Sequence, residues 1–110
     1  MKITDLEGSF RRITDDKGSN ELIEKIEDAD GLLFQCPKCF IKLKGPVGCH
    51  YVMCWTPKVP QTIPPVPGRW KLVGTSLADV TLVAGSSSVH LVGGCQAHFF
   101  VKNGQIESLT

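Results

Sequence analysis

The chain has 110 residues, with twelve lysines and arginines against eleven aspartates and glutamates, so its formal net charge is +1. This length suits a single domain over residues 1–110, and the near-neutral charge is not typical of a strongly basic nucleic-acid-binding protein or of an acidic disordered tail. No apolar run approaches the ~20 residues of a membrane span, and the first residues lack the apolar core of a signal peptide. We therefore expect a soluble, cytoplasmic protein with no membrane partner.

Charge is distributed unevenly along the chain. Residues 1–30 carry five positive and nine negative side chains, whereas residues 31–110 carry seven positive and two negative ones. We expect residues 1–30 to form an acidic arm with a short helix, and residues 31–110 to form a β core. The basic second part could bind nucleic acid, but its lysines are scattered among predicted strands, so solvated strand faces are the simpler interpretation.

The acidic part predicts an arm followed by a short amphipathic helix. Residues 3–13 form the arm, with one strand at about 10–13, and a polar turn follows at 15–18. Ser19 or Asn20 can cap the helix, which ends before Gly31. Its apolar face would consist of Leu22, Ile23, Ile26 and Ala29.

From residue 32 the apolar pattern changes to the period of two that is typical of strands. An apolar run at 32–34 leads into the C-P-K-C segment at 36–39, and residues 41–44 then alternate between apolar and lysine. This pattern predicts a hairpin with the two cysteines at its tip. Residues 50–55 can form the next strand.

The second half of the chain predicts a loop and then a series of short strands. Five prolines between positions 57 and 67 prevent strand pairing, so residues 56–68 form a stiff surface loop of polyproline character. Apolar runs follow at 70–73, 80–84 and 89–92, and Asn103-Gly104 marks a hairpin between 97–102 and 105–109. The predicted fold class is α+β, mainly β: a small antiparallel sheet of five to seven strands, pinned by a zinc-knuckle site, with one short N-terminal helix.

The cysteines are the candidate functional residues of this chain. Five cysteines are an odd number, which argues against a complete disulfide framework and favours metal ligands. A C-x-x-C turn between two strands brings both sulfurs of Cys36 and Cys39 to one point, which suits zinc. A redox pair needs a helix N-terminus after the first cysteine, but residues 40–44 look like a strand. Two merely structural thiols are the remaining alternative.

A structural zinc site needs two further ligands. Cys95 and His98 repeat the two-residue spacing, and Gly93-Gly94 provides backbone freedom before them, so this pair is our choice. His50 and Cys54 are possible alternative ligands, although an extended segment would hold them ~13 Å apart, so that only one of them could contribute. Cys49 is as readily a buried small apolar residue as a ligand.

Several motifs in order resemble a family of small phage and bacterial proteins of unknown function. These are the C-P-K-C segment at 36–39, G-R-W at 68–70, A-D-V-T-L at 78–82 and the C-Q-A-H-F-F-V-K-N-G-Q-I segment at 95–106. The resemblance covers about residues 31–107. It implies that one zinc ion bound by Cys36, Cys39, Cys95 and His98 joins the two ends of a small β domain, and it implies no activity.

Three function classes remain. A site closed by three cysteines and one histidine has no position for the water that zinc catalysis requires, so we expect no catalysis. Our first expectation is a phage-type accessory protein, located in the host cytoplasm or the virion, that binds another protein as a virion component or host-directed factor. The alternatives are a zinc-dependent hydrolase using His50, His98 and one or two thiolates, and a nucleic-acid-binding zinc-ribbon-like protein.

The candidate partner surface comprises Trp55, Lys42, Lys44 and Arg69, and Lys38 and Lys71 would join it on the nucleic-acid-binding face.

Overall fold

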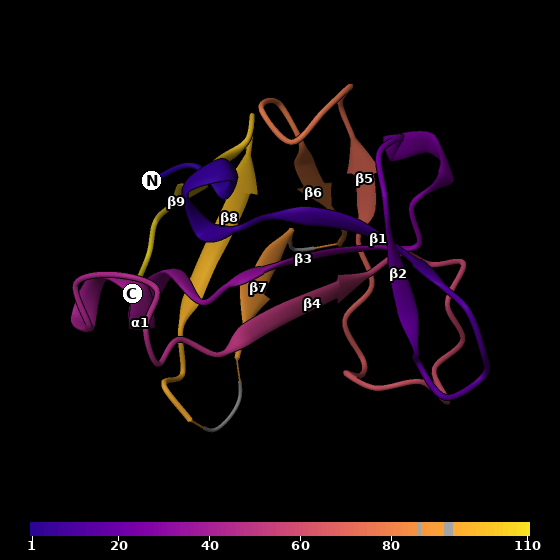
Figure 1. Cartoon of the computed structure of the whole chain (residues 1–110), viewed down its shortest axis with the longest axis horizontal. Coiled ribbons are helices and arrows are strands. Elements are labelled where there is room, and N and C mark those ends of the chain that lie inside the picture. Colours follow the sequence, from indigo (N-terminus) through magenta and orange to yellow (C-terminus); the bar gives the residue numbers. More distant parts are fainter. Residues whose placement is uncertain (86, 92–93) are drawn as a thin grey trace.

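Three antiparallel sheets make up the computed structural model, which describes residues 1–85, 87–91 and 94–110 (Figure 1). The strand orders are β2-β1-β3-β4, β5-β6 and β7-β8-β9. The bounds are η1 (Ile3–Leu6), β1 (Ser9–Ile13), β2 (Asn20–Ile23), η2 (Ile26–Asp28), β3 (Gly31–Gln35), α1 (Pro37–Lys42), β4 (Tyr51–Trp55), β5 (Lys71–Val73), β6 (Thr81–Val83), β7 (Ser88–His90), β8 (His98–Lys102) and β9 (Gln105–Glu107).

The predicted class, mainly β with small antiparallel sheets and one short helix, is confirmed. Three details differ: the described residues form nine strands rather than five to seven, the strands are divided among three sheets rather than one, and the helix occupies Pro37–Lys42 rather than residues 20–29. Within the described residues, no helix is long and apolar enough to cross a membrane.

The helix predicted over residues 20–29 is wrong because this segment completes a hairpin. β2 pairs with β1 from Phe10 opposite Ile23 to Ile13 opposite Asn20. The turn between the strands is closed by the Asp15 carboxylate, which accepts hydrogen bonds from the backbone N–H groups of Lys17 and Ser19 at 2.8 and 3.0 Å. Strand pairing thus satisfies backbone groups that a short isolated helix would leave open at its ends.

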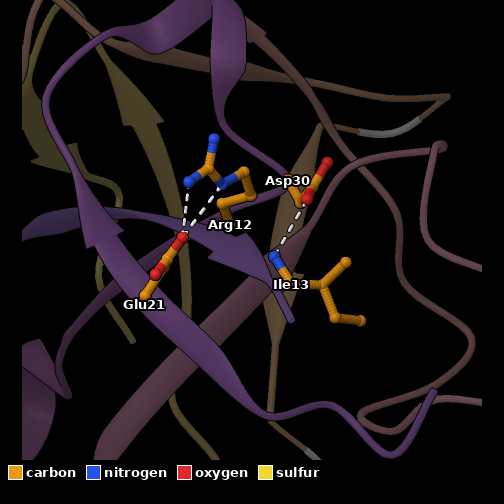
Figure 2. A network of polar contacts seen from close by, with 4 residues as sticks. All are labelled: Arg12, Ile13, Glu21 and Asp30. Carbon is orange, nitrogen blue, oxygen red and sulfur yellow. Dashed lines mark hydrogen bonds and ion pairs between the residues drawn. The ribbon is translucent and has the colours of Figure 1, made fainter. Parts of the chain in front are cut away.

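Polar contacts join the two strands of this hairpin and link it to the residue before β3 (Figure 2). The Arg12 guanidinium pairs across the strands with Glu21, and the Asp30 carboxylate accepts a hydrogen bond from the Ile13 N–H at 2.9 Å. The ion pair is half exposed and stabilises the hairpin only modestly. The Asp30 bond fixes where the chain enters β3.

The core joins the first sheet to the third. Phe34 of β3 and Phe99 of β8 are both fully buried, and their rings meet edge to face with centroids 5.9 Å apart. Residues of β1, β4, β6 and β7 belong to the same cluster; its buried members are Ile3, Leu6, Phe10, Ala29, Leu32, Phe34, Cys36, Val52, Cys54, Val80, Leu82, Val89, Ala97, Phe99 and Val101. This packing brings the end of β3 beside the segment that precedes β8.

The Asn103-Gly104 hairpin is confirmed between β8 and β9. Both turn residues have positive φ, 51° and 73°, as a type I′ turn requires. A side chain at Gly104 would bring its Cβ within 2.3 Å of the Ala78 carbonyl oxygen, so only glycine fits. Strands β5 and β6 lie within the predicted apolar runs, and β7 overlaps the start of the last run, whose final residue Val92 lies outside the described residues.

The proline-rich loop is held by one arginine. Arg69 donates five hydrogen bonds, at 2.7 to 2.9 Å, to loop carbonyls. Trp55 is 2% exposed, and its indole N–H donates to the Pro64 carbonyl at 2.9 Å. The prediction that Trp55 is part of a partner surface is therefore wrong, because its side chain is buried. Arg69 is half-buried, and its guanidinium is engaged by the loop. The carbonyl acceptors of Arg69 belong to Val59, Pro60, Ile63, Pro65 and Gly68.

We expect Arg69→Ala to lower the free energy of unfolding by about 2–4 kcal/mol, because several carbonyls lose a charged donor at once. Arg69→Lys should recover little, since one ammonium cannot reproduce the planar fork of a guanidinium. Urea denaturation followed by tryptophan fluorescence measures both. A change within about 0.5 kcal/mol for Arg69→Ala would show that the loop holds its shape without this residue.

Candidate metal centre

Four metal-ligating side chains from three segments converge at one end of the core. The donor atoms of Cys36, Cys39, His50 and Cys95 all lie within 4.8 Å of one another. The Cys95 sulfur lies 3.4 Å from the Cys36 sulfur and 3.4 Å from His50 Nε2. Zinc–sulfur bonds of about 2.3 Å at tetrahedral angles would place two sulfurs about 3.8 Å apart. The four residues could therefore bind a metal ion with only small movements.

Strand pairing places Cys36 beside His50. Cys36 directly follows β3, and His50 directly precedes β4. The β3–β4 register ends with Gln35 opposite Tyr51, and the next bond of the ladder runs from the Cys36 N–H to the His50 carbonyl at 2.9 Å. Residues so paired have adjacent side chains. The two ligands are therefore brought together by the sheet itself.

Helix α1 places Cys39 beside Cys36. The helix begins at Pro37, whose fixed φ suits the first helical position, and the Phe40 N–H donates to the Cys36 carbonyl at 2.9 Å. Backbone N–H groups of Lys38 and Cys39 face the Cys36 sulfur. The predicted hairpin tip with a strand at 41–44 is thus wrong, although the two sulfurs do converge as expected.

A helix does follow the first cysteine, so the strand predicted at 40–44 no longer excludes a redox pair. The protonation of Cys36 and the composition of the group exclude it instead. In a redox C-x-x-C the first thiol has a lowered pKa. Here burial raises the pKa of Cys36 to about 12. Moreover, a third sulfur and an imidazole complete the group, which favours a metal.

Cys95 reaches the group from the segment between β7 and β8. Its sulfur accepts a hydrogen bond from the Ala97 N–H, and the intervening Gln96 adopts a positive φ of 54° that turns the chain back. Gly94 also has a positive φ, of 56°, as the predicted ligand turn requires, whereas Gly93 lies outside the described residues. Cys95 thus joins ligands that lie more than 40 residues earlier in the chain.

The structure brings His50, and not His98, to the three cysteines. His98 is the first residue of β8, and its ring stacks on that of His90 across the strand pair, with centroids 4.8 Å apart. Side chains alternate between faces along a strand, so the burial of Phe99 in the core turns His98 to the other face. The prediction of His98 as the fourth ligand is therefore corrected to His50.

The remaining cysteines lie outside the group. Cys54 is fully buried in β4 opposite Leu32, and burial raises its pKa strongly. Cys49 donates its thiol hydrogen to the Gly45 carbonyl at 3.3 Å. Of the two alternative ligands that we considered, His50 thus joins the group and Cys54 remains a core residue. The signal for His50 is the β3–β4 register, which sets residue 50 opposite residue 36 one step past Gln35.

The three thiols differ in protonation. Burial raises the pKa of Cys36 to about 12 and also raises the pKa of Cys39. Burial acts in the same direction on Cys95, but hydrogen bonds to its sulfur outweigh burial and lower its pKa to about 6. The donors are His50, the Ala97 N–H, and the Cys36 and Cys39 thiols. At neutral pH the group therefore holds one thiolate and two thiols.

We expect zinc binding near pH 7.5 to release about two protons, one each from Cys36 and Cys39, because the metal binds thiolates and Cys95 is already ionised. The zinc association constant should therefore rise about a hundredfold per pH unit there, and affinity should be lost as the pH falls. Calorimetric titration in buffers with different ionisation enthalpies counts the protons. Release of three would mean that Cys95 is protonated too.

A cavity of about 710 Å³ adjoins the centre. Cys39, His50 and Cys95 contribute to its wall, and part of the proline-rich loop and Trp70 line it as well. His50 is exposed, whereas Cys36 is fully buried. The histidine therefore separates the centre from open space.

Comparisons of the chain with protein-family models, with curated proteins and with solved structures find no match. The resemblance to small phage proteins thus stays a prediction.

Proposed function

We propose that the protein is a small domain stabilised by a structural zinc ion and that it binds another protein. The observation that carries the zinc assignment is the convergence of three cysteine sulfurs and one imidazole nitrogen. Soft thiolate ligands with one imidazole select zinc among the common divalent ions. Four protein ligands leave no position for water, so the zinc is structural rather than catalytic.

Zinc at this position would fasten two sheets together. Cys36 and His50 belong to the β3–β4 pair, Cys39 belongs to α1, and Cys95 leads into β8. One ion thus restrains segments that are separated by 55 intervening residues between Cys39 and Cys95. A chain of this size benefits from such a restraint because its single core provides limited net stability.

The protein-binding part of the proposal rests on the outer side of the zinc ligand turn. Ile41, Leu43 and Val47 are 56%, 49% and 87% exposed. Lys42 and Lys44 alternate with them and are exposed as well. We name these five residues the knuckle surface. Exposed apolar side chains that adjoin one another and are rimmed by charge are typical of protein-binding sites.

Affinity purification from the producing cell tests this use of the knuckle surface. We expect a specific protein, an untagged second copy of this chain included, to co-elute with the tagged wild-type chain and to be lost with Lys42→Glu/Lys44→Glu. The matched control is Lys58→Glu/Lys102→Glu, which changes the same charge at exposed positions elsewhere. The resemblance to phage proteins supports a partner in the virion or among host factors in the cytoplasm. Equal loss of the partner in both variants would contradict a site on the knuckle surface.

Nucleic-acid binding is a weaker proposal. Of the five cations assigned to that face, Arg69 is engaged by loop carbonyls, which leaves Lys38, Lys42, Lys44 and Lys71. Retention on DNA or RNA that falls with rising salt would support it. Absence of retention at low salt would dismiss it.

One observation favours a zinc hydrolase as the second candidate, namely the cavity beside His50 and Cys95. Hydrolysis would require water to replace one ligand, and the exposed His50 is the one that faces open space. Cobalt substitution separates the two candidates. A closed tetrahedral site gives a thiolate-rich spectrum that small anions do not change, whereas an open site responds to them.

A further inference from the structure

Opposite ends of the molecule differ in the charge of their exposed side chains. Along the longest axis, α1 lies at one end and β2 lies towards the other (Figure 1). Residues 36–50, which include α1 and the knuckle surface, have three lysines and no acidic side chain. The knuckle surface is therefore basic as well as apolar.

The β2 end is acidic and contains an apolar groove. The groove has a volume of about 420 Å³, and its lining includes Phe10, Leu22, Ile23, Glu24 and Leu77. Leu22 is 65% exposed at its edge. Four exposed carboxylates lie on or near β2, namely Glu21, Glu24, Glu27 and Asp28. Arg12 pairs with Glu21 and Lys25 is also exposed, so Glu24, Glu27 and Asp28 leave this end with a net negative charge.

We propose that the partner of the knuckle surface is a second copy of this chain, whose acidic groove receives it. The inference rests on the proposed use of the knuckle surface for protein binding. Leu43 and Val47 would enter the apolar groove, while Lys42 and Lys44 meet Glu24 and Glu27 of the next copy. Each end is apolar at its centre and charged at its rim, and the two charges are opposite, which is the complementarity that selects one partner over others.

Because the two surfaces differ and lie at opposite ends, the contact is heterologous. Each copy bound in this way leaves one basic and one acidic end free, so association continues beyond a dimer unless the copies close into a ring. Both surfaces are small. We therefore expect weak association that depends on salt, as is typical of contacts at the low end of interface size.

Sedimentation of the zinc-loaded chain tests the proposal. At about 20 mM salt, the weight-average mass should rise steadily between about 10 μM and about 1 mM protein, and at about 500 mM salt it should fall back to that of the monomer. Lys42→Glu/Lys44→Glu and, separately, Glu24→Lys/Glu27→Lys should each weaken association at least about tenfold. An equimolar mixture of the two variants should associate again, because the first keeps a native acidic end and the second a native basic end.

The control Lys58→Glu/Lys102→Glu should associate like the wild type. A chain that stays monomeric at low salt and about 1 mM, or a variant mixture that does not associate, overturns the inference. Zinc content is measured in the same samples. Monomeric protein with one bound zinc rejects only the self-association, whereas protein without zinc rejects the zinc assignment itself.

Discussion

Zinc removal is expected to unfold the protein or to lower its Tm by tens of degrees. Structural zinc binding contributes on the order of 10 kcal/mol at neutral pH, and domains of this size have net stabilities of about 5–15 kcal/mol. Each kilocalorie lost lowers Tm by about 4 °C or more in a chain of this length. Even half of the zinc contribution would therefore move Tm by about 20 °C.

Circular dichroism during heating, with and without a chelator, measures this effect. Metal analysis must show one zinc per chain before chelation and none afterwards, and returning zinc should restore the original Tm. The β3–β4 hairpin and the segment before β8 should lose their mutual contacts first, because the ligands join them. An unchanged Tm after verified metal removal would contradict a stabilising role for the ion.

Replacing His50 and replacing His98 should have opposite effects on zinc affinity. His50→Asn is expected to weaken zinc binding more than about 100-fold, because it removes one of the four ligands. His98→Asn should leave zinc affinity within about threefold of the wild type, since its ring stacks on His90 away from the centre. Competition with a chromophoric chelator measures both. The reverse outcome would restore His98 as the fourth ligand.

Cysteine variants provide the matched comparison. Cys36→Ser should abolish stoichiometric zinc, whereas Cys49→Ser should retain it because Cys49 lies outside the group. Cys54→Ser should also retain zinc but lower the free energy of unfolding by about 1–3 kcal/mol, since it buries a hydroxyl in the core. In the cobalt-substituted protein, the intensity of the thiolate bands should indicate three sulfur ligands.

Where periodicity and turn chemistry were both strong, the sequence predicted the structure well. The apolar run at 32–34 lies in β3, the alternation at 50–55 became β4, and Asn103-Gly104 closes the last hairpin. These signals are local: side-chain alternation and a turn that needs positive φ do not depend on the rest of the fold.

Where two local structures competed, the prediction failed. The spacing of apolar residues at 22–29 suited a helix, but the Asp15 turn and pairing with β1 made residues 20–23 a strand. After Cys36 the error was reversed, because alternation at 41–44 suggested a strand where Pro37 begins a helix. Short segments carry weak intrinsic preferences, so tertiary pairing decides them.

The amino-acid pattern alone determined that this chain is mainly β and that Cys36, Cys39 and Cys95 are ligand candidates. Only the tertiary structure decided the fourth member, because a histidine's side chain faces the centre or turns away according to strand register. Register placed His50 opposite Cys36 and turned His98 to the other face of β8. Spacing along the chain cannot encode that choice, since a shift of one residue reverses the face of every side chain in a strand.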